Sequence, residues 1–566
     1  MIFSRRKFLK YAAVSAGSTL LAETPFLPAR AREKVKADGS DVRYVPTTCE
    51  MCFWKCGVIA KVVDGKVVKL EGNPRHPQSR GRLCARGQGG IGLLYDKDRL
   101  KVPMIRTGPR GSGPRGENRY KQASWDEALG YVAKKLKEIA AKHGPEAVGL
   151  FAHGSSGTYF NNVVRAMGSA NVAYPSFSQC LGARDVAWEL TFGIKPNSTC
   201  ERVDLANSRV IILFGTHLGE NMHNSQTQEF AEAVGRGAKI IVVDPRYSTA
   251  ASKASMWLPI KPGTDLALLL AWINIIISEG WYDKEYVKQY TTGFERLRKE
   301  VEQYTPAWAA QETDLPMDKI VEAVREIGRY APNVLLHPGR HFSWHGNDTQ
   351  RGRAMAIINA LLGTWGRPGG LWLPPKVNLP SFSENPEHPE AKQDPVVFGD
   401  YPFAGGEGLT QELRKATITG KPYPIKAWIV TGTNLLKTMP QQELTRKAID
   451  NLDLLVAIDV MPTDTVMHAD VILPECTYLE RHDGLFTITT REAGIAIRQP
   501  AVKPLYQSRP GWWIGSELCK KLGLAQYAVK DTWEGRMRRQ ARTWGLDYDR
   551  LARVGYIPLP GSGRPY

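Results

Sequence analysis

The stretch Thr48-Cys49-Glu50-Met51-Cys52-Phe53-Trp54-Lys55-Cys56-Gly57 places three cysteines on one short segment, separated by two and then three residues. A fourth cysteine follows further along, in Gly81-Arg82-Leu83-Cys84-Ala85-Arg86-Gly87. Three crowded thiolates and a distant fourth suit the four irons of a cubane iron–sulfur cluster. Zinc usually takes two paired C-x2-C knuckles, and a pair of disulfides would suit an exported chain. Both stay open as alternatives on the spacing alone.

The segment between the third and fourth cysteines predicts a β-hairpin. Two short apolar stretches, residues 58–63 and 66–70, flank the dipeptide Asp64-Gly65. Asp-Gly between two such stretches is a strong signal for a tight hairpin turn. We therefore expect a small β-rich subdomain to present the cysteines.

The first residues have the pattern of an export signal. Ser4-Arg5-Arg6-Lys7-Phe8-Leu9-Lys10 precedes an apolar stretch at residues 11–22 and then Ala29-Arg30-Ala31, an A-x-A pattern that a signal peptidase can cut. The paired arginines predict a twin-arginine signal over residues 1–31, which exports proteins already folded. A basic N-terminal helix is the alternative. The predicted location is the periplasm or the outer face of the cytoplasmic membrane.

Composition narrows the class of protein further. The chain has 566 residues, of which 42% are hydrophobic and 23% charged, so several packed domains are expected. No apolar run approaches the roughly 20 residues that span a bilayer, and no direct membrane span is predicted. The formal net charge is +18, but the basic residues are dispersed along the chain. A nucleic-acid partner is therefore not expected.

Two stretches of the chain have the order of a nucleotide-binding α/β unit. Residues 209–214 predict a buried parallel strand ending at Gly215, a helix extends to about residue 234, and residues 239–243 predict a second strand that ends in Asp244-Pro245-Arg246. Ligands bind at the carboxyl ends of such strands, and an acid after the second strand commonly holds a sugar or base edge. A similar order recurs over residues 425–430, 454–459 and 469–474.

The cysteine pattern, its continuation Cys84-x-Arg86-Gly87 and both α/β units resemble the molybdopterin oxidoreductases, which carry a molybdenum or tungsten bis(guanine dinucleotide) cofactor. The resemblance implies a multidomain α/β fold with a small N-terminal β-rich [4Fe-4S] subdomain and two Rossmann-like dinucleotide-binding domains. The family's C-terminal β-barrel is expected to be absent, because residues 555–566 form a proline-rich, loop-like end. The expected divisions are a signal peptide at 1–31, the cluster subdomain at 42–105, a first-dinucleotide domain at 181–359, and a second-dinucleotide domain made of 106–180 and 360–566.

The resemblance also implies roles for individual residues. Cys49, Cys52, Cys56 and Cys84 would bind the [4Fe-4S] cluster, and Arg86 would lie between the cluster and the pterin. The contacts to the first guanine dinucleotide would come from Gly215, Glu220, Asn221, Asp244, Arg246, Gly263 and Asp265. Gly432, Asn434 and Asp459 would line the second.

Three further residues would form the catalytic site. Cys180 stands where the family's protein ligand to molybdenum occurs, and a soft thiolate suits that metal; a buried structural cysteine is the alternative. His153 and Arg340 are similar to a histidine and an arginine that face the metal in the polysulfide and thiosulfate reductase branch. The cation would hold an anionic sulfur chain and the histidine would supply a proton. The alternative for each is a hydrogen-bonded structural residue.

The implied function is that of the catalytic subunit of a membrane-associated molybdenum oxidoreductase that reduces polysulfide or thiosulfate. Electrons would come from the quinol pool through a ferredoxin-like, multi-cluster iron–sulfur subunit docked to a quinol-oxidising membrane anchor. Loops rather than the scaffold select the substrate, so arsenate, arsenite, tetrathionate and selenate remain alternatives. A truncated electron-transfer module without a competent molybdenum site is a further alternative.

Overall fold

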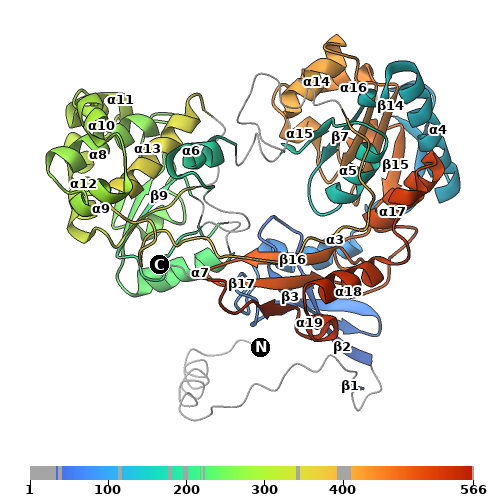
Figure 1. The fold of residues 1–566 in the computed structure, drawn as a ribbon, viewed down its shortest axis with the longest axis horizontal. Coiled ribbons are helices and arrows are strands. Elements are labelled where there is room, and N and C mark those ends of the chain that lie inside the picture. Colours follow the sequence, from blue (N-terminus) through green and yellow to red (C-terminus); the bar gives the residue numbers. More distant parts are fainter. Residues whose placement is uncertain are drawn as a thin grey trace, which may run out of the picture.

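The computed structural model describes residues 34–35, 41–111, 118–175, 182–195, 202–216, 218–220, 224–339, 345–391 and 409–563. Their strands form sheets of four, four, seven and three strands, all open. Figure 1 shows two α/β lobes on either side of the molecule, with the N-terminal strands and a C-terminal sheet lying beneath and between them. Among the helices in these ranges, none has the length and apolar character needed to cross a membrane.

The N-terminal sheet is an antiparallel meander of β1 (Lys34–Val35), β2 (Asp41–Thr48), β3 (Gly57–Val63) and β4 (Lys66–Gly72). Strands β3 and β4 pair Val63 with Lys66 across a two-residue turn. Asp64 and Gly65 both have positive φ, at 48° and 75°, as the tight hairpin turn requires. The predicted hairpin is confirmed.

The first α/β lobe contains a parallel sheet in the order β11-β10-β9-β12. Its strands are β9 (Val210–Phe214), β10 (Lys239–Val243), β11 (Met256–Leu258) and β12 (Val334–Leu336). One face packs on α8 (Asp265–Ser278), α12 (Met317–Tyr330) and α13 (Asp348–Leu361), with α9 (Lys284–Tyr290), α10 (Phe294–Val301) and α11 (Pro306–Thr313) outside them. The other face packs on α6 (Gly182–Phe192) and α7 (Asn224–Gly235). Both predicted strands and the connecting helix are present.

The second lobe is built on a seven-stranded sheet in the order β6-β5-β15-β14-β13-β7-β8. The strands are β5 (Met104–Thr107), β6 (Arg119–Gln122), β7 (Val148–Ala152), β8 (Val172–Ala173), β13 (Ala427–Thr431), β14 (Leu454–Asp459) and β15 (Val471–Pro474). All neighbours from β15 to β8 pair in parallel, whereas β5 and β6 pair antiparallel. The chain therefore leaves this sheet after β8, builds the first lobe, and returns as β13.

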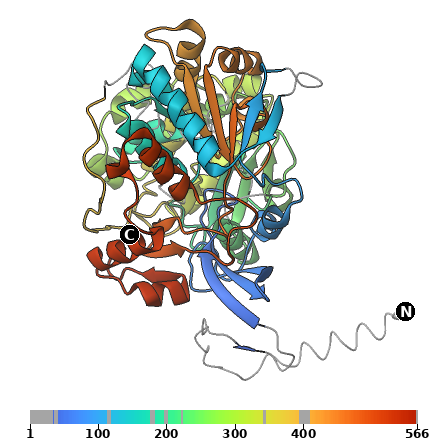
Figure 2. The same cartoon turned by 90° about the vertical axis from the view of Figure 1, so that its right-hand side faces the viewer.

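Helices cover both faces of this second sheet (Figure 2). Helices α4 (Trp125–His143), α5 (Gly157–Ala166) and α17 (Gly511–Leu522) lie on one face, and α14 (Thr410–Thr419), α15 (Leu435–Thr438) and α16 (Gln442–Asp450) on the other. Helix α4 has a capped N-terminus, because the Ser124 side chain accepts a hydrogen bond from the Glu127 N–H at 3.1 Å.

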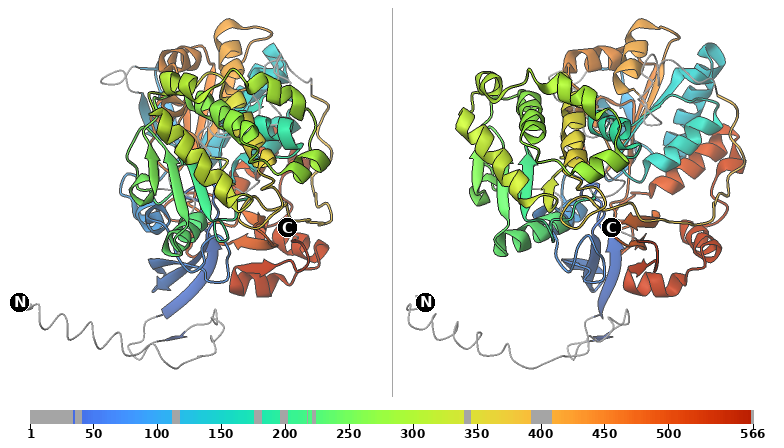
Figure 3. Two further views of the ribbon diagram at one scale, coloured as in Figure 1. Left: turned by 90° about the vertical axis from the view of Figure 1, so that its left-hand side faces the viewer. Right: turned by 60° about the vertical axis from the view of Figure 1, so that its left-hand side comes forward.

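A third antiparallel sheet consists of β16 (Gly484–Thr489), β17 (Ala493–Arg498) and β18 (Tyr556–Pro558), with α18 (Trp533–Thr543) and α19 (Tyr548–Val554) beside it. Its side chains and backbone join those of β2: the Thr48 hydroxyl donates to the Ile497 carbonyl at 2.8 Å. Figure 3 shows these C-terminal elements beside the N-terminal strands. Sequence analysis had grouped residues 484–558 with the second lobe and did not separate this sheet.

Candidate functional site

The four clustered cysteines lie where the N-terminal sheet meets the two lobes. Cys49 follows β2, Cys56 precedes β3, and Cys84 precedes α2 (Ala85–Gln88). The Cys49 N–H donates to the Cys56 carbonyl at 2.8 Å, which closes the loop that carries Cys52. No disulfide joins Cys49, Cys52, Cys56 or Cys84 within the described ranges, unlike the alternative considered from the sequence.

The electrostatics of these thiols suit metal binding. Burial raises the pKa of Cys49 to about 12, and the nearby Cys52 and Cys84 thiols add to the rise. Burial likewise raises the pKa of Cys56, with further contributions from the other three thiols. Such thiols ionise when metal ions replace their protons. No three His, Cys, Asp or Glu side chains of the described ranges converge tightly enough for a single metal ion. A cubane needs a wider ring of sulfurs, because each cysteine binds a different iron.

The first lobe and the third sheet both reach the cysteine loop. From the first lobe, the Asn224 side-chain amide donates to the Cys56 sulfur at 3.7 Å, and the Trp54 indole donates to the Ser225 hydroxyl at 3.3 Å. From the third sheet, Arg498 donates to the Cys49 carbonyl at 3.2 Å. The loop is therefore positioned by segments far away in the sequence.

Arg86 provides the first test of the implied pterin cofactor. It lies in α2, two residues after Cys84, and its Nε and Nη2 atoms are buried without a hydrogen-bond partner among the described residues. Buried guanidinium donors are costly when left unpaired. An acceptor-rich ring beside the cluster would satisfy them, so Arg86 fits the group implied by the sequence.

The predicted residues of the second dinucleotide unit gather at one edge of the second sheet. Strands β7, β13 and β14 end in register, which places His153, Gly432 and Asp459 side by side. The His153 N–H donates to the Thr431 carbonyl at 3.0 Å. Gly432 has a φ of 63°, and any Cβ there would collide with the His153 carbonyl oxygen. Glycine is therefore required at the end of β13.

Asp459 is a half-buried carboxylate without a cation among the described residues. Its Oδ1 accepts the N–H groups of Val460 at 2.6 Å and Met461 at 3.3 Å, and no ion pair involves it within the described ranges. Burial raises its pKa to about 6. Asn434, by contrast, is occupied by the protein: its amide donates to Asp464 at 3.1 Å and accepts from the Thr465 hydroxyl at 2.9 Å. Asp459 is thus available to a ligand, while Asn434 shapes the loop.

The first lobe repeats this arrangement at the ends of β9 and β10. Asp244 is 5% exposed, accepts the Arg246 N–H at 2.8 Å, and forms no ion pair among the described side chains. Glu220 and Arg246 pair with each other at 2.6 Å. The remaining predicted positions lie on turns beside them: Gly215 and Gly263 have φ values of 52° and 85°, and Asp265 begins α8, 3.5 Å from Arg351.

Asp244 and Asp459 therefore occupy equivalent places in the two lobes. Each follows the second strand of its unit, and each offers carboxylate oxygens without a protein cation. A guanine edge presents N–H donors that such a carboxylate can accept. The two sites fit the two dinucleotide arms of the implied cofactor.

The predicted catalytic residues are only partly within the described ranges. Cys180, Arg340 and the dinucleotide contact Asn221 lie outside them, as does the expected signal at residues 1–31. His153 lies just after β7 and keeps accessible surface, although surrounding protein crowds it enough for burial to lower its pKa. The charge of Glu50, which follows the first cysteine of the loop, acts to raise the pKa of His153.

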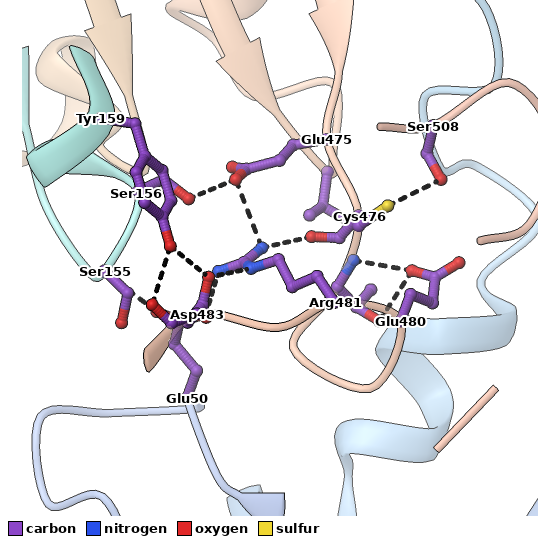
Figure 4. A network of polar contacts seen from close by, with 12 residues as sticks. Glu50, Ser155, Ser156, Tyr159, Glu475, Cys476, Glu480, Arg481, Asp483 and Ser508 are labelled. Carbon is purple, nitrogen blue, oxygen red and sulfur yellow. Dashed lines mark hydrogen bonds and ion pairs between the residues drawn. The ribbon is translucent and has the colours of Figure 1, made fainter. Parts of the chain in front are cut away.

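Sequence analysis missed a buried ion network that joins the cysteine loop to the second lobe (Figure 4). Glu50 pairs with Arg481, and with Arg498 at 3.0 Å, and it accepts the Ser155 N–H at 3.0 Å. Asp483 bonds both guanidinium groups, at 2.8 Å to Arg481 and 2.6 Å to Arg498. Burial alone would raise the pKa of Glu50, but the two arginines outweigh it and lower the value to about 2.

Glu475 is the third carboxylate of this network. It pairs with Arg481 at 3.4 Å and accepts the Ser156 hydroxyl. Burial raises its pKa to about 7, and the neighbouring carboxylates Asp483 and Glu50 add to the rise. Three carboxylates therefore share two guanidinium groups. No local pattern of the sequence marks these residues, because their partners come from distant segments.

A parallel α/β core with two dinucleotide-type edges and a thiolate loop between them defines a molybdopterin-dependent oxidoreductase. The family model described as molybdopterin oxidoreductase matches residues 99–521, and that of the molybdopterin oxidoreductase Fe4S4 domain matches residues 42–96. The chain belongs to this family. Its cofactors are accordingly a [4Fe-4S] cluster and molybdenum bis(molybdopterin guanine dinucleotide), which selects the cluster over zinc for the cysteine loop.

Individual relatives place the chain within the family. It is 35% identical to the thiosulfate reductase molybdopterin-containing subunit PhsA of Salmonella typhimurium, over 98% of this chain and 74% of that protein. It is 26% identical to the dimethyl sulfoxide reductase DmsA of Haemophilus influenzae, over 92% and 70% of the two chains. The solved structure of the acetylene hydratase from Pelobacter acetylenicus superposes with a TM-score of 0.74 at 25% identity, over 92% of this chain and 75% of that one.

Proposed function

We propose that the chain is the catalytic subunit of a membrane-associated enzyme that reduces the sulfur–sulfur bond of thiosulfate or polysulfide. The observation that carries the proposal is the 35% identity to a thiosulfate reductase subunit along almost the whole chain. Relatives with other substrates, such as dimethyl sulfoxide and nitrate reductases, match at 26% and 27% identity. Because the identity to the sulfur-reducing relative exceeds the identity to these two, a sulfur compound is the favoured substrate.

Each predicted site residue has a place in this proposal. Cys49, Cys52, Cys56 and Cys84 hold the cluster, Arg86 donates to the adjacent pterin, and Cys180 binds the metal. When bound, the molybdenum cofactor supplies the two electrons that cleave the sulfur–sulfur bond. Asp244 and Asp459 hold the two guanine ends, and Gly432 allows the second arm to approach the strand ends closely.

His153 and Arg340 would bind and protonate the substrate. Arg340 would attract an anionic sulfur chain through its permanent charge. Burial lowers the pKa of His153, and the charge of Glu50 acts to raise it. An anionic substrate bound beside the imidazole would also raise that pKa, which favours the protonated form that delivers a proton to the departing sulfur.

The proposed partners and location come from the same reasoning. An iron–sulfur subunit carrying several clusters would pass electrons to the [4Fe-4S] cluster, and a quinol-oxidising membrane subunit would supply them. The twin-arginine pattern of residues 1–31 would export the folded, loaded protein to the periplasmic side. The chain itself would sit on that membrane complex.

A reductase assay with a reduced dye tests this function across thiosulfate, polysulfide, tetrathionate and arsenate. We expect turnover with thiosulfate or polysulfide, and a loss of about 10²–10⁴-fold in kcat for His153→Gln, which is the range for a missing general acid. His388→Gln is the matched control, because His388 stacks on Tyr527 away from the strand edge and burial also lowers its pKa. Fastest turnover of arsenate would contradict the sulfur proposal, and no turnover by metal-loaded protein would favour an electron-transfer module.

A further inference from the structure

We propose that the Tyr478 hydroxyl donates a hydrogen bond to the sulfur of Cys49 and thereby raises the reduction potential of the [4Fe-4S] cluster. The inference rests on the proposed assignment of Cys49 as a cluster ligand. Tyr478 would act through that ligand as a positioning and tuning residue, without touching the substrate.

The hydroxyl of Tyr478 is isolated from all ordinary partners. The side chain is 2% exposed, and its oxygen is buried with no hydrogen-bond partner among the described residues. Buried tyrosine hydroxyls usually find a hydrogen-bond partner, because an unpaired one costs free energy. A buried phenol with this deficit points to an acceptor that becomes available only in the loaded protein.

Cys49 is the group that Tyr478 faces. The Cys49 side chain packs in the same buried cluster of side chains as Tyr478. The phenolic O–H of tyrosine has an ordinary pKa near 10 and is therefore a hydrogen-bond donor at neutral pH.

The surrounding backbone leaves room for this contact. Gly90 begins α3 (Gly90–Tyr95), and a Cβ at that position would overlap the Tyr478 hydroxyl. The φ of Gly90 is not in the left-handed region, so backbone conformation alone does not demand glycine there. The close approach of the hydroxyl is what requires it.

Hydrogen bonds to ligand sulfurs are one of the factors that set the potential of an iron–sulfur cluster. Reduction adds negative charge to the cluster and its thiolates, so a donor stabilises the reduced form more than the oxidised form. Cys49 already receives the Met51 N–H at 3.4 Å, and Cys56 receives Asn224. Tyr478 would give Cys49 a second donor that only a distant segment can supply.

The test is a redox titration of the cluster in the intact, cofactor-loaded protein, followed by electron paramagnetic resonance. In Tyr478→Phe we expect the midpoint potential of the cluster to fall by up to about 59 mV. For a one-electron couple this equals a tenfold change in the ratio of reduced to oxidised cluster. Tyr548→Phe is the matched control, since the Tyr548 hydroxyl is also buried and unpaired but lies in a different cluster of side chains. We expect its potential to equal that of the wild type.

Two further measurements keep the inference falsifiable if Tyr478→Phe assembles poorly. Gly90→Ala would displace the hydroxyl without removing it and should lower the potential in the same direction. In the wild type, exchange into deuterium oxide should reveal an exchangeable proton coupled to the reduced cluster beyond that of the Met51 N–H. Unchanged potentials in both variants would overturn the role of Tyr478 alone. If the wild type contains iron and the Cys49→Ala variant keeps its cluster, the assignment of Cys49 as a cluster ligand would be overturned.

Discussion

Asp244 and Asp459 are single residues whose surroundings indicate a ligand site. Each carboxylate lies at the end of a strand and has no cation among its described neighbours; Asp244 is buried and Asp459 half-buried. Burying an unpaired charge costs free energy unless a ligand or partner compensates it. The position of both acids could be predicted from the sequence, because each follows an apolar strand. The role of Asn434 could not, because Asp464 and Thr465 occupy its amide only once the chain has folded.

Asp459→Asn should stabilise the protein when the cofactor is absent. The folded pKa of about 6 exceeds the ordinary value of 3.8, so stability is fully present below pH 3.8 and is lost as pH rises through 6. At 1.36 kcal/mol per pKa unit, ionisation of Asp459 lowers the free energy of unfolding of the wild type by about 3 kcal/mol. The variant does not undergo this loss.

Urea unfolding of cofactor-free protein between pH 5 and pH 8 measures this effect. The variant's advantage should grow with pH over the lower part of that range and then level off. A variant that is less stable than the wild type at pH 8 would contradict the unpaired-carboxylate description. The same variant should bind the molybdenum cofactor more weakly, because it loses the acceptor for the guanine edge.

At the scale of elements, local chemistry explains most of what the sequence predicted. The Asp64-Gly65 turn and the strands β9, β10, β13 and β14 each depend on residues close together in the chain. The third sheet was not predicted, because its edge strand β18 pairs with β17 from a distant part of the chain.

The hairpin turn gives an element-scale prediction. Gly65→Ala should lower the free energy of unfolding by about 1–2 kcal/mol, because an L residue at a φ of 75° pays that cost even though no neighbouring atom lies within 4 Å. Gly92→Ala is the matched control: it also has open space but lies in α3 with ordinary φ, and should gain about 0.5–1 kcal/mol. Equal effects of the two substitutions in urea unfolding would contradict the assigned turn.

For the whole molecule, buried ion pairs between distant segments join the cluster region to the second lobe. Arg99 and Glu480 pair at 2.7 Å with both side chains fully buried. Glu50, Arg481, Arg498 and Asp483 form the larger network beside the cysteine loop. Apolar periodicity predicts strands and helices, but it does not indicate which charged residues will meet across the molecule. These pairs could only be found in the structure.

Glu50→Gln tests that connection. Removing one member of a buried ion network leaves charge uncompensated, so we expect the free energy of unfolding to fall by about 3 kcal/mol at pH 7. The folded pKa of Glu50 is about 2, so the difference should persist above pH 4.5 and shrink as pH falls toward 2. Glu71→Gln, which breaks only an exposed pair with Lys69, should cost less than about 1 kcal/mol. Equal losses in the two variants would show that the network does not bind the lobes together.

The central claim is that four thiolates hold an iron–sulfur cluster that exchanges electrons with a molybdenum centre in the same chain. Elemental analysis of anaerobically purified protein tests it most directly. We predict iron near four and molybdenum near one per chain, with the iron lost in Cys84→Ala, since each cysteine binds one iron of the cubane. Protein that contains zinc in place of iron, or that retains all its iron in Cys84→Ala, would contradict the account.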